Sequence, residues 1–71
     1  MTMLNKQVVG SLCTIQNINL PINKKIKLLG LGISNTKEIK VLRNRSGDLI
    51  VGIGNGRIGI GRNLSRYIEV V

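Results

Sequence analysis

The chain has 71 residues, of which 42% are hydrophobic, and its 11 Lys and Arg against 3 Asp and Glu give it a net charge of +8. A chain of this length buries only about 60% of the surface that it exposes when unfolded, which excludes a second domain and a deep cleft, so we expect residues 1–71 to form one domain. Trp and Phe are absent and Tyr67 is the only aromatic residue, so the core has to consist of Ile, Leu and Val, a composition that favours strands.

The first predicted elements are a strand and a short helix. Residues 11–18 have strand composition, and the strand must end before Pro21, because proline has no N–H for a central ladder. In residues 24–32, Leu28 and Leu31 lie three residues apart, which predicts a short helix with an apolar face, expected to contact a partner along its flank, and a terminal glycine as its stop. Its basic face comprises Lys24 and Lys27.

A further strand, a turn and a hairpin follow. Residues 38–43 alternate as in a half-buried strand, and residues 46–48 (Ser-Gly-Asp) are typical of a turn. Asn55-Gly56 is the commonest pair in a type I′ turn, because both central residues need positive φ. A two-residue loop at that pair would place Ile53 opposite Ile58, and Val51 opposite Ile60.

That hairpin would have one apolar face and one glycine face. The apolar face, expected toward the core, comprises Val51, Ile53, Ile58 and Ile60. Gly52, Gly54 and Gly59 line the other face. Missing Cβ atoms allow either sharp curvature of a small barrel or close approach of another backbone, and the sequence leaves both open.

The C-terminal residues predict a single helical turn and a closing strand. Asn63 can cap a turn that runs through Tyr67, and residues 68–70 can return to the sheet. About five short strands with one or two short helices predict a mainly β fold, a small barrel that removes exposed sheet edges.

The residue supply argues against an enzyme, a metal site or a cofactor site. Cys13 is the only cysteine and there is no His, so the ligand sets of zinc and haem sites are missing and no base can activate the thiol. The apolar run before Cys13 is too short for a secretory signal, and no stretch approaches the roughly 18 residues of a membrane span. We therefore expect a soluble, cytoplasmic protein.

Two further patterns resemble catalytic motifs without their context. The three carboxylates, Glu38, Asp48 and Glu69, are isolated in sequence, so we expect them in ion pairs or turns. Residues 54–59 match G-x-G-x-x-G, but a dinucleotide site needs a helix after the glycines and an acidic residue some 20 positions on, and only 12 residues follow Gly59. We interpret this string as a hairpin.

Basic residues group at three places, and these are the candidate partner-binding residues. A positive field attracts nucleic acid, anionic lipid or an acidic protein face, although the charges could also serve only solubility. Tyr67 is the only side chain on which a base could stack, so a nucleic-acid site rests on charge alone. The candidates are Lys24, Lys25, Lys27, Arg43, Arg45, Arg57, Arg62 and Arg66.

Several segments occur in a characteristic order along the chain. They are Gly10 with Cys13 and Ile15, residues 27–33 (Lys-Leu-Leu-Gly-Leu-Gly-Ile), residues 39–41, and residues 56–70 with their Gly-Arg, short-helix and Ile-x-Val pattern. In this order they resemble the FeoA family, which includes the SH3-like C-terminal domains of some metal-dependent repressors. Asn35-Thr36 stands where the family usually has Pro-Gly, which suggests a turn of another type there, and the charge is more positive than is usual.

The resemblance implies an SH3-like β-barrel and a cytosolic accessory role in bacterial ferrous iron uptake, through interaction with the membrane transporter FeoB. Iron itself need not touch the chain. Two alternatives stay open: a small basic barrel that binds RNA or DNA through phosphates, and a repressor-type domain that acts on a DNA-binding regulator. The two main readings differ in salt dependence, because phosphate contacts weaken steeply with salt.

Overall fold

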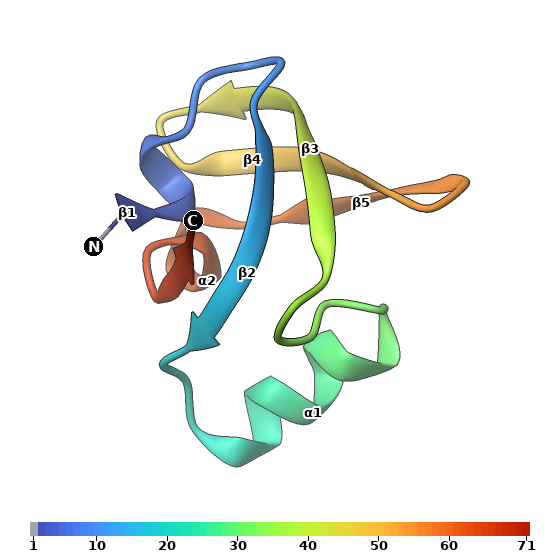
Figure 1. Cartoon of the computed structure of the whole chain (residues 1–71). Coiled ribbons are helices and arrows are strands. Elements are labelled where there is room, and N and C mark those ends of the chain that lie inside the picture. Colours follow the sequence, from blue (N-terminus) through green and yellow to red (C-terminus); the bar gives the residue numbers. More distant parts are fainter. Residues whose placement is uncertain (1) are drawn as a thin grey trace.

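The structure, a computed structural model that describes residues 2–71, is a curved antiparallel sheet of six strands with short helices at its ends (Figure 1). The strands are β1 (Thr2–Met3), β2 (Leu12–Ile18), β3 (Glu38–Arg45), β4 (Asp48–Ile53), β5 (Gly56–Ile60) and β6 (Ile68–Val70). The helices are the 3-10 helix η1 (Leu4–Lys6) and the α-helices α1 (Ile22–Gly30) and α2 (Arg62–Ser65). The predicted mainly β fold is confirmed.

The sheet order is β1-β6-β2-β3-β4-β5, so the two ends of the described chain meet at one side of the sheet. Thr2 pairs with Val70, and β6 also pairs with β2, with Ile18 opposite Ile68 (Figure 1). Strand β6 lies where the sequence placed its closing strand. Strand β1 was missed, because two residues are too few to show an alternation.

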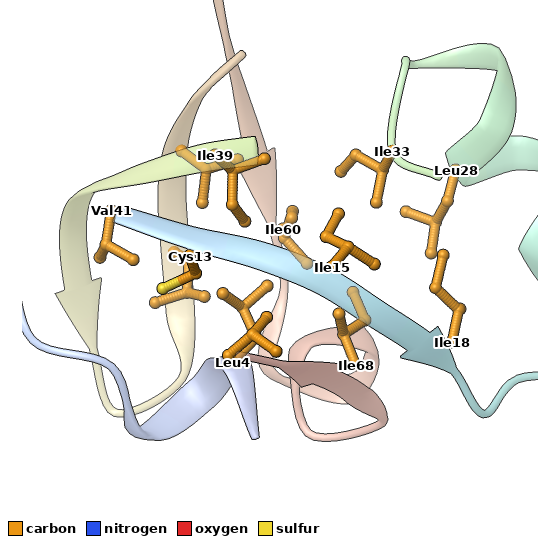
Figure 2. Packing of buried hydrophobic residues seen from close by; sticks show 13 residues of the cluster. Leu4, Cys13, Ile15, Ile18, Leu28, Ile33, Ile39, Val41, Ile60 and Ile68 are labelled. Atoms are coloured by element: carbon orange, nitrogen blue, oxygen red, sulfur yellow. The ribbon is translucent and has the colours of Figure 1, made fainter. Parts of the chain in front are cut away.

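The core lies on the concave side of the sheet and is aliphatic (Figure 2). Alternate residues of β2 and β3 point inward, and a bulge in β2 between Ile15 and Asn17 restores the inward direction at Ile18. Helix η1 adds Leu4, which is fully buried. The core residues are Leu4, Cys13, Ile15, Ile18, Leu28, Ile33, Ile39, Val41, Leu49, Val51, Ile60, Ile68 and Val70.

The β4–β5 hairpin turns at Gly54-Asn55, so the predicted Asn55-Gly56 turn and register are wrong. Ile53 pairs with Gly56, Val51 with Ile58, and Leu49 with Ile60. Gly54 has φ +55°, and it stands at the first central position, as glycine does in type II′ turns. The predicted faces still hold, because the pairing moves by two positions and side chains alternate with a period of two.

The reason for this register lies at the other end of the hairpin. The Asp48 side chain at the start of β4 accepts a hydrogen bond from the Arg62 N–H at 2.8 Å. This bond requires Asp48 to lie opposite Gly61, as it does when Leu49 pairs with Ile60. In the predicted register Ile50 would lie opposite Gly61 instead. The type I′ geometry occurs instead in the β3–β4 turn, where Ser46 and Gly47 have φ of 52° and 95°.

Helix α1 begins two residues earlier than predicted, directly after Pro21, and ends in a Schellman motif at Gly32. Gly32 has φ +89°, its N–H donates to the Leu29 carbonyl, and the Ile33 N–H donates to the Leu28 carbonyl. Leu28 and Ile33 are both buried and join the core at this point (Figure 2). The expected glycine stop is confirmed, and of the two leucines predicted on the apolar face Leu28 is buried, whereas Leu31 is 51% exposed.

The turn before β3 keeps a glycine-like backbone although it contains no glycine. Thr36 has φ +69°, and the Lys37 N–H donates to the Ser34 carbonyl at 3.2 Å, as across a β-turn. Positive φ at the third of four residues is the pattern of the type II turn that Pro-Gly forms. The expectation of another turn type at Asn35-Thr36 is therefore wrong, and a β-branched residue occupies a left-handed conformation.

Helix α2 is one turn long, but its start differs from the prediction. Its N-cap is Gly61, and Asn63 lies inside the helix rather than at its cap. The carboxylate of Asp48 replaces a local cap, because it accepts from the first N–H of the helix. At the other end the buried Ser65 hydroxyl donates to the Gly47 carbonyl at 2.6 Å, which ties α2 to the β3–β4 turn.

Candidate interaction surface

The described residues, 2–71, contain no cluster of three or more His, Cys, Asp or Glu side chains within reach of one metal ion. The surface of the same residues forms no pocket. None of the helices in this part of the chain is long and apolar enough to cross a membrane.

Asp48 and Arg62 form an ion pair at the junction of β4 and α2. The guanidinium donates to Asp48 Oδ2 from Nη2 at 2.8 Å and from Nε at 3.2 Å, while the Arg62 N–H donates to Oδ1. These bonds lower the pKa of the Asp48 carboxyl and raise that of Arg62. The expectation that Asp48 serves in a turn or ion pair is confirmed, and Arg62 is committed to a neighbour within the chain.

Glu69 and Cys13 are held in contacts that stabilise the fold. Glu69 is almost buried, and its Oε1 accepts a hydrogen bond from the Asn19 amide at 2.7 Å. Cys13 is 3% exposed, and its thiol faces the Gln7 Oε1 at 3.6 Å. Burial raises the pKa of the Cys13 thiol, which keeps it protonated and unreactive at neutral pH.

Four cations lie on the outward face of β3, β4 and β5, opposite to the core. Lys40 pairs with Gly52, and Gly52 with Arg57, so these residues form one row across three strands. Arg43 lies in the neighbouring row, beside Ile50. We call Lys40, Arg43 and Arg57 the outer basic surface, and Arg45 lies at its end opposite Asp48.

The other predicted cations lie elsewhere, so the candidates do not form one continuous site. Lys24, Lys25 and Lys27 are on α1, which projects from the barrel at one end of the molecule (Figure 1). The Arg66 guanidinium lies 5.1 Å from the centre of the Tyr67 ring, which engages the one aromatic side chain in a cation–π contact. Lys40 was absent from the predicted partner-binding residues. It faces outward because β3 alternates, and Arg43 faces the same way because the bulge at Leu42 adds one residue between them.

The glycine face of the hairpin is partly explained by a contact within the chain. A Cβ on Gly52 would lie 3.5 Å from Leu42 Cδ1, so the Leu42 side chain extends over this glycine. Leu42 is the extra residue of the β3 bulge, which turns it outward. A side chain of the neighbouring strand therefore covers Gly52, which is neither of the two alternatives that the sequence left open for this face.

Helix α1 carries a second apolar face that the sequence reading missed. Ile22, Ile26 and Leu29 are spaced i, i+4, i+7 and therefore lie on one face of the helix. They are 69%, 57% and 47% exposed. The spacing is visible in the sequence, but the predicted helix began at Lys24, and its apolar face was defined by Leu28 and Leu31 alone.

Comparison with known proteins places the whole described chain in one family. The model of the FeoA domain matches residues 2–71. The crystal structure of an iron uptake regulatory protein (FeoA) superposes with a TM-score of 0.89 at 27% identity, covering 97% of this chain and 93% of that one. A comparison with curated protein sequences gave no significant match.

Two structures of lower identity share the fold. The solution structure of iron(II) transport protein A from Clostridium thermocellum has a TM-score of 0.88 and 24% identity, covering 97% of this chain and 44% of that one. A manganese-dependent transcriptional repressor has a TM-score of 0.85 and 21% identity, covering 94% of this chain and 39% of that one. The predicted SH3-like barrel, shared by FeoA proteins and repressors, is confirmed.

Proposed function

The chain belongs to the FeoA domain family, and we propose that it is a small cytoplasmic accessory protein of bacterial ferrous iron uptake that acts by binding the membrane transporter FeoB. The observation that carries this proposal is the match of the FeoA model to residues 2–71. The similar structure described as an iron uptake regulatory protein supports a regulatory rather than a catalytic role. The chain would tune or assemble the transporter through surface contacts.

The outer basic surface is the site that we propose for this contact. Its three exposed cations lie on the paired strands β3 and β5, so the surface is preformed and binding needs little ordering of the chain. The net charge of +8 would speed the encounter with an acidic face of the transporter's cytosolic part. Arg45 lies at the end of the same ladder, opposite Asp48, and would contribute at the rim.

The test is binding of the purified chain to the cytosolic domain of FeoB at about 50 and 200 mM salt, the range in which phosphate contacts lose most of their affinity. We expect saturable binding that persists at the higher salt. Charge reversal of the outer basic surface should weaken it by about tenfold or more, because like charges are then set against each other. The variant is K40E/R43E/R57E.

The matched control reverses the same number of charges on α1, as K24E/K25E/K27E. Equal weakening by the two variants would show that only net charge matters and would remove the outer basic surface from the proposal. Weakening by the α1 variant alone would move the contact to that helix.

The alternative, phosphate binding to RNA or DNA, is favoured by the same row of cations across the sheet. It predicts binding of a random RNA oligomer with a log–log salt slope close to one unit per phosphate neutralised. Such a slope, together with no binding to FeoB, would mean that the domain binds nucleic acid. Binding to a DNA-binding regulator instead would favour the repressor-type role.

A further inference from the structure

Helix α1 presents its longest apolar stripe to solvent, away from the barrel. Ile22, Ile26 and Leu29 lie on one face over two turns and are each about half exposed or more. Figure 1 shows α1 at one end of the molecule, outside the sheet. A globular helix normally turns its apolar stripe to the core, so this orientation calls for an external partner.

Helix α1 cannot rotate to turn the stripe inward, because Leu28 already anchors a different face of the helix in the core. Leu28 is 2% exposed and lies about a third of a turn from the centre of the stripe. Its carbonyl accepts the Ile33 N–H, and both side chains enter the core (Figure 2). The Schellman motif therefore fixes the rotation of α1, and the stripe stays outside.

The charged residues of α1 and of the segments that flank it in sequence are all of one sign. Lys24, Lys25 and Lys27 lie on the same nine-residue helix, and residues 16–37 contain no Asp or Glu. Lysine side chains are long enough to lie beside an apolar stripe and still keep the ammonium group in a polar layer. An occupant of this face must therefore be apolar in its interior and negative at its surface.

We propose that α1 lies flat on the surface of an anionic lipid bilayer, with Ile22, Ile26 and Leu29 in the acyl boundary and the lysines among the headgroups. A basic amphipathic helix is the usual element for this contact. A second copy of the chain fits less well, because a second α1 would bring three more lysines and no carboxylate to the contact. The inference stands independently of the proposed transporter contact, with which it agrees in location.

Sedimentation with lipid vesicles in the absence of FeoB tests the proposal. The vesicles are phosphatidylcholine alone, or with one part in three of phosphatidylglycerol, at about 100 mM salt. We expect binding to the anionic vesicles and little to the neutral ones. The affinity should be modest, near millimolar lipid, since even a whole myristoyl chain gives only about 10⁴ M⁻¹.

Two pairs of variants separate the helix from general stickiness and charge. I22S/I26S should weaken vesicle binding by about tenfold or more, because it removes two side chains from the acyl layer. V8S/V9S, which removes residues that are 72% and 60% exposed off the helix, should bind like the wild type. K24Q/K25Q/K27Q should lose about fivefold per lysine, and clearly more than the equally charged control R43Q/R45Q/R57Q.

Circular dichroism of each variant confirms that the fold is kept, which exposed substitutions should not disturb. Absence of vesicle binding by the folded wild type would overturn the proposal, as would equal losses in the two members of either pair. The stripe would be assigned to a protein partner if the wild type binds no vesicles and I22S/I26S loses binding to the FeoB domain or to a second copy of the chain. The FeoB-free assay leaves the transporter proposal to its own test.

Discussion

Replacing Gly47 by Ala should destabilise the domain through two separable effects, and Gly10 provides the control for one of them. The two glycines have nearly the same backbone, with φ +95° at Gly47 and +94° at Gly10. A Cβ on Gly47 would lie 3.1 Å from Arg62 Cβ and 3.5 Å from the Ser65 hydroxyl, whereas a Cβ on Gly10 meets nothing within 4 Å. Only G47A therefore adds a collision to the backbone strain.

The magnitudes follow from these distances. A left-handed conformation costs an L-residue about 1–2 kcal/mol, and the stiffer unfolded chain of the Ala variant returns about 0.4–1 kcal/mol. G10A should thus lose about 1 kcal/mol. Forcing α2 away from the β3–β4 turn adds an overpacking cost of about 1–3 kcal/mol, so G47A should lose about 2–4 kcal/mol, much of the roughly 3–5 kcal/mol that one small core supplies.

Urea unfolding followed by circular dichroism measures both variants against the wild type. A loss of 1 kcal/mol corresponds to a fall of about 4–8 °C in Tm for a domain of this size. Equal losses in the two variants would show that the contact with α2 carries no energy. A G47A variant with the same free energy of unfolding as the wild type would refute the packing of α2 on the β3–β4 turn.

Three further changes test other parts of the structure. T36G should stabilise the chain by up to about 1 kcal/mol in urea unfolding, because it relieves the left-handed Thr36 backbone, and a loss would show that the Thr side chain makes a needed contact. Arg62 lowers the pKa of Asp48, so the ion pair stabilises the fold above the usual Asp pKa and is lost as the pH falls through the lowered value. The Tm gap between wild type and D48N should therefore narrow below about pH 4, and a gap that stays constant down to pH 2 would contradict this. L28A should lower the free energy of unfolding by about 2–4 kcal/mol and speed amide exchange in α1. The control L29A, at a residue that is 47% exposed, should change it by less than about 0.5 kcal/mol. Equal effects of the two variants would mean that Leu28 does not anchor the helix.

The sequence predicted the strands that have a strong alternation. All of residues 38–43 and 68–70 lie in strands, and so do residues 12–18 of the predicted 11–18, since their apolar spacing matches the pleat. The core residues of the hairpin were also predicted, because a shift of two positions preserves the faces. The helix stop at Gly32 followed from its conformational freedom.

The features that were missed depend on contacts between distant residues. The hairpin register is set by Asp48 and Arg62, which lie 14 residues apart, so the turn residues alone could not decide it. The same contact takes Arg62 out of the free basic residues. The outward stripe of α1 depends on which of two apolar faces meets the barrel, and Leu28 with Ile33 decides this only in the folded chain.

The pairing of Thr2 with Val70 has a consequence for how such a domain can be combined with others. Because the first and last strands are neighbours, a polypeptide could enter and leave at almost one point. Adjacent ends are the arrangement that tolerates circular permutation and insertion into a host protein. A linker joining the two ends would need to span only the gap between neighbouring strands, and new ends could be opened at the exposed Gly54-Asn55 turn with the sheet order intact.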